Sequence, residues 1–195
     1  LQDCFSYVRA WLAQHIDILP SAIQMQSIYI DLIQAREDSD PCIEWSEFRL
    51  RKHKNFLFLL SSDHFSNKKV ITELEENTWQ GSSVNFTFGE LTCIEEVNNP
   101  GLKPGGYVLR FWQDGDVAKP NKRATRKIKK WFQDFSIPNW ARHCWPIIVD
   151  EKTNTIAAVP GLFVCQGYQV EPSELGWFCS WKVNNLIARN KIKFD

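Results

Sequence analysis

The sequence predicts an α+β fold: a small helical unit with a β-hairpin, followed by a mixed β domain with one principal helix. Apolar residues recur at helical spacing near the start of the chain, as in Phe5, Val8, Leu12 and Ile16. Short β-like runs separated by turn residues fill most of the remaining chain. Apolar residues make up 44% of the 195 positions, which supports a packed core and argues against disorder.

Two helices are expected in the first unit. Residues 3–16 are predicted to form an amphipathic helix that Pro20 ends. Ser21 and Gln24 have the spacing of a capping box, which opens a second helix. The apolar side of that second helix is expected to carry Ile23, Ile30 and Ile33.

A β-hairpin is expected over residues 48–60, because apolar residues alternate there with Arg49 and Arg51. Its turn is expected at residues 54–55. The alternation predicts that one face of the hairpin is polar and the other is buried.

The polar stretch of residues 61–69 is the candidate linker, so we expect a first unit over residues 1–65 and a second over residues 66–195. In the second unit, one helix is expected near residues 125–135. The expected strands are residues 70–74, 84–88, 91–94, 107–112, 147–150, 155–159, 161–168 and 177–183.

The formal net charge is zero, but the charges are segregated. Residues 119–130 contain seven Lys or Arg and no acid, whereas residues 73–96 contain six Glu and no base. This asymmetry favours one face that binds a polyanion.

The principal helix is expected to be apolar on one side and basic on the other. At about 100° per residue, Arg123, Arg126 and Lys130 would project away from the core. A start at Asn121 or Thr125 would put Arg126 in the first turn, where the helix dipole disfavours a cation but an anion such as phosphate binds well. A solvated helix face without a ligand is the alternative reading. The core stripe would hold Ala124, Ile128, Trp131, Phe132 and Phe135.

The candidate RNA-binding residues surround this helix. Trp140 would either stack on a base or anchor its own turn. Arg110 would either face the same groove or be an ordinary solvent-side strand residue. The full set is Arg110, Lys119, Arg123, Arg126, Lys127, Lys130, Trp140 and Arg142.

The residues give no convincing catalytic or metal site. No two of the six cysteines have the C-x-x-C spacing, and His143 next to Cys144 has no further ligand nearby in sequence. No apolar run approaches the roughly 20 residues that span a bilayer. In the absence of a signal peptide we expect reduced thiols and a cytoplasmic location.

Several motifs resemble the two C-terminal modules of bacterial tRNA(Ile)-lysidine synthases. The strongest is Arg-Lys-Ile-Lys-Lys-Trp-Phe-Gln at residues 126–133, followed by Ile-Pro-Asn-Trp-Ala-Arg at residues 137–142. Further similar stretches are residues 19–21, 34–36, 45, 49–51, 110–111, 115, 119–120, 123, 145–148, 156–159, 161–165 and 177–181. The chain departs from the family pattern at Asn139 and His143, where a proline and a carboxylate are usual.

The resemblance implies a tRNA-binding region of a larger ligase. Members of this family join lysine to the wobble cytidine of a minor isoleucine tRNA, using ATP and Mg²⁺ in an N-terminal ATP-pyrophosphatase domain. Its Ser-Gly-Gly-x-Asp-Ser signature is absent here, and the chain begins at Leu1, so we expect a fragment without catalytic domain, cofactor or activity of its own. The implied partners are tRNA(Ile) and the N-terminal catalytic domain, with no membrane; a homodimer is left open.

Two other hypotheses belong to different classes of protein. A non-catalytic protein-interaction module would use the basic helix to dock an acidic protein surface. A self-contained enzyme would use Cys144 or His143.

Overall fold

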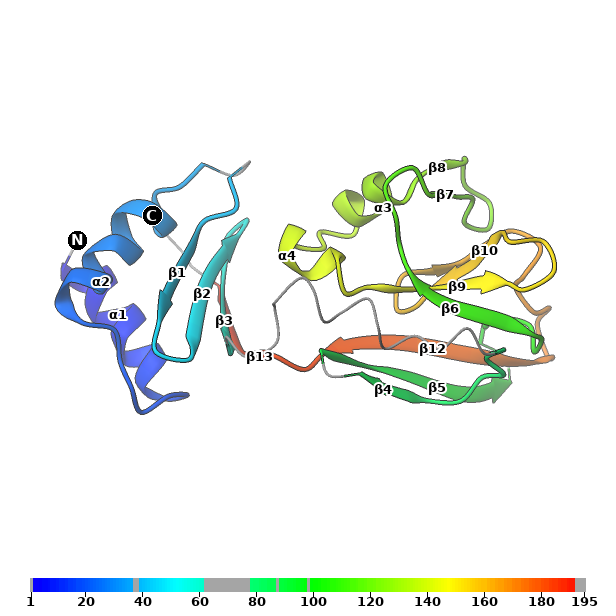
Figure 1. Ribbon diagram of the computed structural model, residues 1–195, viewed down its shortest axis with the longest axis horizontal. Helices are drawn as coiled ribbons and strands as arrows, with labels where there is room; N and C mark the ends of the chain where they lie inside the picture. The colour runs from blue at the N-terminus through cyan, green and yellow to red at the C-terminus, as the bar shows by residue number, and fades with distance from the viewer. Residues whose placement is uncertain (1, 37–38, 62–77, 87, 98, 192–195) are drawn as a thin grey trace. The chain divides into compact units, whose positions relative to one another are not determined.

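The computed structural model describes residues 2–36, 39–61, 78–86, 88–97 and 99–191. The chain divides into two compact units (Figure 1). The first comprises residues 1–65 and 184–195, and the second comprises residues 66–183.

The helices of the first unit are α1 (Gln2–Ala13), α2 (Ala22–Ser27) and the π-helix η1 (Ile28–Ile33). The predicted capping box is confirmed, because the Gln24 amide donates to Ser21 Oγ at 3.3 Å and the Ser21 amide donates to Gln24 Oε1 at 2.9 Å. The predicted apolar side was wrong for Ile23 and Ile30, which are exposed. The buried side carries Met25, Ile28, Leu32 and Ile33, which pack against Val8, Leu12 and the sheet.

A four-stranded antiparallel sheet completes this unit, in the order β1-β2-β3-β13. The predicted hairpin is confirmed, with its turn at Lys54, whose φ is +52°. The bounds are β1 Cys42–Trp45, β2 Phe48–His53, β3 Phe56–Ser61 and β13 Leu186–Lys191.

The last strand corrects the expected division of the chain. The sequence pattern predicts that residues 184–195 belong to the second unit, but β13 pairs with β3 and Ala188 belongs to the core of the first unit. The pairing satisfies the backbone hydrogen-bonding groups of β3, which would otherwise be an open edge strand. No local pattern in the sequence of residues 184–195 predicts this pairing. The expected linker beyond Ser61 and the expected strand at residues 70–74 lie outside the described residues.

The second unit contains two larger sheets, in which every described strand pair is antiparallel. One sheet has the order β12-β5-β4, with β4 Val84–Phe86, β5 Gly89–Val97 and β12 Leu175–Val183. The other has the order β11-β10-β9-β6, with β6 Tyr107–Phe111, β9 Pro146–Asp150, β10 Ile156–Val159 and β11 Phe163–Val164. A short ribbon pairs β7 (Val117–Ala118) with β8 (Arg126–Lys127), and the helices are α3 (Ile128–Asp134) and α4 (Asn139–Arg142). With the helical first unit, this is the predicted α+β class.

Aromatic side chains join the layers of the second unit. Phe111 at the end of β6 lies 5.2 Å from Phe88, centroid to centroid, on the side of the β12-β5-β4 sheet. The next residue, Trp112, lies 5.5 Å from Phe132 of α3. The side chains of successive residues in an extended chain point to opposite faces of the sheet. The sheet that contains β6 therefore lies between α3 and the β12-β5-β4 sheet, as Figure 1 shows.

An ion pair fixes the loop that leads from β6 to the ribbon. Both terminal nitrogens of Arg110 donate to the Asp116 carboxylate at 2.8 Å, and Nη1 also donates to the Phe111 carbonyl at 3.0 Å. Although burial alone raises the pKa of Asp116, hydrogen bonds from Arg110 and the Gln113 amide outweigh it and hold that pKa below its usual value. Asp116 in turn accepts the Ile128 amide on its backbone oxygen at 2.9 Å, where α3 begins. Arg110 therefore positions the loop and the helix start.

Replacing Asp116 with Asn tests this role. Because the pKa of Asp116 is lower in the folded chain than in the unfolded chain, the pair stabilises the fold above about pH 4, and this stabilisation is lost as the pH falls through the folded value. We expect Asp116→Asn to lower the free energy of unfolding at pH 7 by about 1–3 kcal/mol. Hydrogen exchange of peptides from residues 107–134 at pH 7 and, rate-corrected, at pH 3 measures the effect.

The matched control is Asp114→Asn, an exposed carboxylate in the same loop. The Asp116→Asn deficit should shrink at pH 3, and the control should change little at either pH. An equal deficit at both pH values would contradict the role of the ion pair.

Candidate nucleic-acid interface

The basic segment, residues 119–130, is anchored along its main chain before the helix starts. The Gln166 amide donates to the Lys119 carbonyl at 2.8 Å, and the Asn121 amide donates to the Val164 carbonyl at 3.2 Å. A turn closed by the Arg123 amide and the Pro120 carbonyl, at 3.1 Å, comes next. The segment is therefore fixed against β11 and the residues after it.

The predicted start of the principal helix was wrong. Arg126 and Lys127 form β8 and pair with Ala118 and Val117, so α3 begins only at Ile128. The ribbon takes up the backbone groups of these two residues, which a helix-propensity argument could not foresee. Arg126 therefore lies before the helix and not in its first turn, which Lys129 and Lys130 occupy instead.

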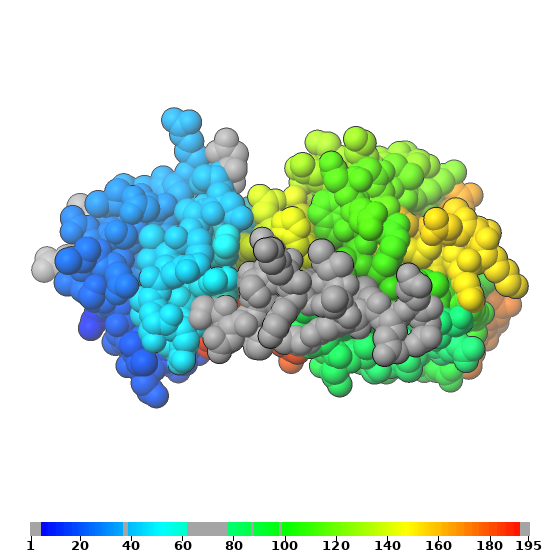
Figure 2. All heavy atoms as spheres, in the orientation of Figure 1, coloured from blue at the N-terminus to red at the C-terminus, as the bar shows by residue number. Residues whose placement is uncertain are grey.

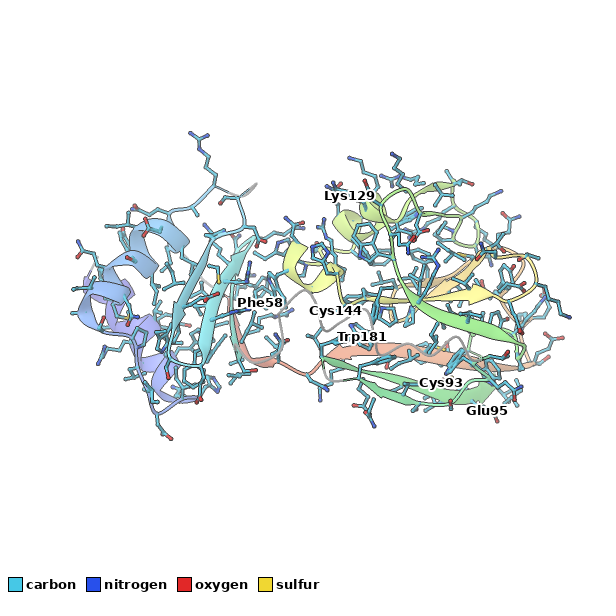
Figure 3. The ribbon with its side chains drawn as sticks, viewed as in Figure 1. Phe58, Cys93, Glu95, Lys129, Cys144 and Trp181 are labelled. Carbon is cyan, nitrogen blue, oxygen red and sulfur yellow. The ribbon has the colours of Figure 1, made fainter. Side chains whose placement is uncertain are left out.

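The predicted core side of α3 is confirmed for Ile128, Trp131 and Phe132, which are buried. The prediction was wrong for Ala124, which is exposed and lies before the helix, and Phe135 remains 36% exposed beside Phe163. On the other side of α3, Lys129 and Lys130 are exposed. Figure 3 shows Lys129 on the outer side of α3, away from the sheets.

Two arginines lie over the Trp131 ring instead of pointing directly away from the core. The guanidinium carbons of Arg126 and Arg123 are 4.9 Å and 5.7 Å from the ring centroid. Such cation–π contacts contribute about 0.5–1 kcal/mol each at exposed sites. They hold the guanidinium groups over the ring while both side chains stay exposed at the surface.

Arg126 also pairs with Asp134 at 2.6 Å. The two side chains are 41% and 43% exposed, so this is a surface ion pair of small energy that salt or a ligand readily displaces. Within the residues that the structure describes, it is the one ion pair made by the basic segment.

The result is an exposed cluster, which we call the basic surface. All seven of its cations are exposed, and the light-green residues at the top of Figure 2 show this part of the outer surface of the second unit. Lys122 and Lys129 are added to the predicted residues because their side chains are exposed in the same segment. The basic surface comprises Lys119, Lys122, Arg123, Arg126, Lys127, Lys129 and Lys130.

An open groove of about 550 Å³ lies beside this surface. Its lining includes Lys119, Thr125, Gln166 and Tyr168, and the Tyr168 hydroxyl is hydrogen-bonded to Thr155 at 2.6 Å. Sequence reasoning missed the groove, because its walls come from residues far apart in the chain. Cation, hydroxyl and amide groups together suit the phosphate and ribose of a nucleic acid.

Two predicted contacts, Trp140 and Arg142, are instead part of the fold. Both are buried, at 8% and 7% exposure. Arg142 donates to the Ile137 carbonyl from Nε at 2.9 Å and from Nη2 at 2.8 Å, and its own carbonyl accepts from Trp112 Nε1. These bonds close the turn before α4. The burial of Trp140 supports the alternative that this residue anchors its own turn.

Arg110 is the third predicted contact that the structure engages elsewhere, in the ion pair with Asp116. Five predicted residues therefore remain together on the basic surface. These are Lys119, Arg123, Arg126, Lys127 and Lys130.

Cys144 has no features of a nucleophile. Its thiol is buried and donates to the Ala141 carbonyl at 3.2 Å, and burial raises its pKa to about 12, so it stays protonated at neutral pH. Across the described part of the chain, no group of three or more His, Cys, Asp or Glu is placed to hold a metal ion. Nor does this part contain a helix that is long and apolar enough to cross a membrane.

Comparison with known proteins assigns both units. Residues 5–58 match the family model for the TilS substrate binding domain, and residues 108–181 match that for the TilS substrate C-terminal domain. A solved structure titled "Crystal structure of TILS C-terminal domain" is also similar, with a TM-score of 0.41 and 17% identity over 54% of this chain and 92% of that one.

Curated relatives named tRNA(Ile)-lysidine synthase match along most of the chain. The relative from Photobacterium profundum is 29% identical over 178 residues, covering 89% of this chain and 40% of its own length. The relatives from Vibrio campbellii and Coxiella burnetii are 29% and 26% identical, each covering 87% of this chain and 38% of their own length. The chain thus spans about two fifths of these relatives, and it belongs to the tRNA(Ile)-lysidine synthase family, whose substrate-binding and C-terminal domains it carries.

Proposed function

We propose that this chain holds the body of tRNA(Ile) for a lysidine synthase, with the basic surface as its main RNA contact. The observation that supports this most directly is the gathering of seven exposed cations with one weak acidic partner among the described residues. Such a surface attracts a polyanion even though the whole chain has zero formal net charge.

The chemistry of the surface suits double-helical RNA. An A-form helix presents phosphates and 2′-hydroxyls, while the base edges of its deep groove are out of reach of side chains. Lysines on α3 and the preceding turn supply mobile charges for phosphates. Arg123 and Arg126 supply planar donors that are already oriented by Trp131.

The groove beside the basic surface extends the same contact. Lys119 lies on both, and Thr125 and Tyr168 add hydroxyl groups that bond to ribose or phosphate oxygens. A backbone running over α3 and into this groove would meet charge first and hydroxyl groups next.

The chemical step is proposed to take place elsewhere in the intact protein. Two observations support this proposal: the sequence lacks the Ser-Gly-Gly-x-Asp-Ser signature, and among the described residues no group of three or more His, Cys, Asp or Glu is placed to hold a metal ion. We assign ATP, Mg²⁺ and lysine to an N-terminal catalytic domain, and we place the intact ligase in the cytoplasm. This chain by itself is proposed to be inactive.

The salt dependence of tRNA binding tests the role of the basic surface. With four to five phosphate contacts, the logarithm of the binding constant should fall with the logarithm of salt concentration with a slope of about −3 to −5. Replacing Arg123, Arg126 and Lys130 together by Ala should make that slope shallower by about two units. Fluorescence anisotropy with labelled tRNA(Ile) at several salt concentrations measures both slopes.

The control replaces Lys103, Lys152 and Lys182 by Ala, because these are three exposed lysines outside the basic surface and the change in net charge is the same. Its slope should stay near that of the original chain. Equal slopes for the two triple variants would remove α3 and its turn from the interface. If the chain bound an acidic protein but did not bind tRNA, this would favour the alternative that the basic helix docks on a protein surface.

Reconstitution tests the division of labour within the ligase. The family's N-terminal domain joined to the full chain should transfer radiolabelled lysine to tRNA(Ile), and the chain alone should transfer none. Removal of residues 106–183 from the joined protein should reduce transfer mainly at low tRNA concentration, because binding and not chemistry is lost. Lysine transfer by the chain alone would overturn the proposal.

A further inference from the structure

Two thiols face each other in the second unit, away from the basic surface. Cys93 on β5 and Cys179 on β12 are directly opposed in the strand pairing, and both are half-buried. Their sulfur atoms are 3.6 Å apart, with the Cys179 thiol donating to the Cys93 sulfur. Figure 3 shows Cys93 in the sheet formed by β5 and β12.

The backbone at this pair has the geometry of a non-hydrogen-bonded position. The Cys93 amide donates to Ser83 Oγ at 3.0 Å, and its carbonyl accepts from the same hydroxyl at 3.4 Å. The Cys179 carbonyl accepts the Gly161 amide at 2.8 Å. These peptide groups are therefore engaged away from the opposite cysteine, as in the closer of the two cross-strand positions.

That position brings opposed Cα atoms to about 4.5 Å, which lies within the range of about 4.4–6.8 Å that a disulfide spans. Closing the sulfur–sulfur bond then needs side-chain rotation and little movement of the strands. No backbone hydrogen bond between β5 and β12 has to break at this point.

We propose that Cys93 and Cys179 are an oxidative modification site, at which hydrogen peroxide oxidises the two thiols to a reversible disulfide. The Cys93 thiolate attacks one peroxide oxygen, the O–O bond breaks, and water leaves after protonation, so Cys93 becomes a sulfenic acid. Cys179 then attacks the sulfenic sulfur, loses its proton and expels a second water. Two thiols are oxidised to one disulfide, and one peroxide is reduced to two waters.

The local chemistry assigns the order of attack. The hydrogen bond from Cys179 lowers the pKa of Cys93, and the same bond, with burial, raises the pKa of Cys179. Cys93 is therefore the attacking thiol and Cys179 the resolving thiol.

The other cysteines whose side chains the structure describes, Cys42, Cys144 and Cys165, lack this arrangement. Burial raises the pKa of both Cys144 and Cys165 to about 12, and Cys42 lies beside Glu44 in the first unit, with its pKa raised by burial. The Cys93–Cys179 disulfide would enclose residues 94–178, which include the whole basic surface. Oxidation would thus restrict unfolding of the segment that presents it.

Peptide mapping of the intact chain tests the proposal directly. The native 195-residue chain is treated with hydrogen peroxide, its remaining thiols are alkylated, and its digest is examined by mass spectrometry without reduction. The expected product is a peptide pair joining Cys93 to Cys179, lighter by two hydrogen atoms and separated by dithiothreitol. Urea-unfolded chain treated in the same way should give scattered pairings.

Thermal unfolding adds a second readout. Peroxide should raise the melting temperature by roughly 5 °C or more, and dithiothreitol should reverse the shift. Cys93→Ser should abolish the shift, whereas Cys165→Ser should keep it. Cys93 recovered as a sulfinic acid or an alkylated thiol, with Cys179 alkylated, would overturn the proposal in the native chain whether or not the variants fold.

Discussion

The burial of Trp131 determines how the basic surface is presented. Its ring packs 5.6 Å from Phe163, and its indole N–H donates to the Ala118 carbonyl at 3.2 Å, so one side chain joins α3 to β11 and to β7. The same ring lies beneath Arg123 and Arg126. Because this side of α3 is fixed to the sheet, Lys129 and Lys130 must face solvent. The packing of Trp131 therefore has two results: it buries the apolar side of α3, and it leaves the basic side exposed.

Some residues of the types that bind RNA instead hold the fold together. Arg110, Arg142 and Trp140 have the residue types of RNA contacts, but each is engaged in holding a turn or a loop. The exposed cations of the basic surface lie within one segment of the chain. Acidic residues elsewhere, such as Glu90, Glu95 and Glu96 on β5, help to bring the formal net charge of the whole chain to zero. A neutral protein can thus carry a strongly cationic face, and its affinity for RNA should depend on that face and on salt, not on net charge.

The sequence alone predicted those features that local patterns determine. The capping box at Ser21, the hairpin turn at Lys54 and the burial of Trp131 follow from spacing within a few residues, and all three are confirmed. The start of α3 and the place of β13 depend on pairing with Val117 and with β3, partners that spacing does not reveal. For the same reason, the sequence identified the cations but could not tell an exposed Lys130 from a buried Arg142. The groove beside Lys119 needed the whole fold.

Lysine reactivity measures, residue by residue, whether tRNA lies on the basic surface. The chain is acetylated briefly with and without a saturating amount of tRNA(Ile), and each lysine is quantified by mass spectrometry. We expect the lysines of the basic surface to lose reactivity when tRNA is bound, namely Lys119, Lys122, Lys127, Lys129 and Lys130. Lys103, Lys152 and Lys182 should keep theirs, since they are exposed elsewhere on the second unit. Unchanged reactivity on α3, or equal protection of both sets of lysines, would contradict tRNA binding at the basic surface.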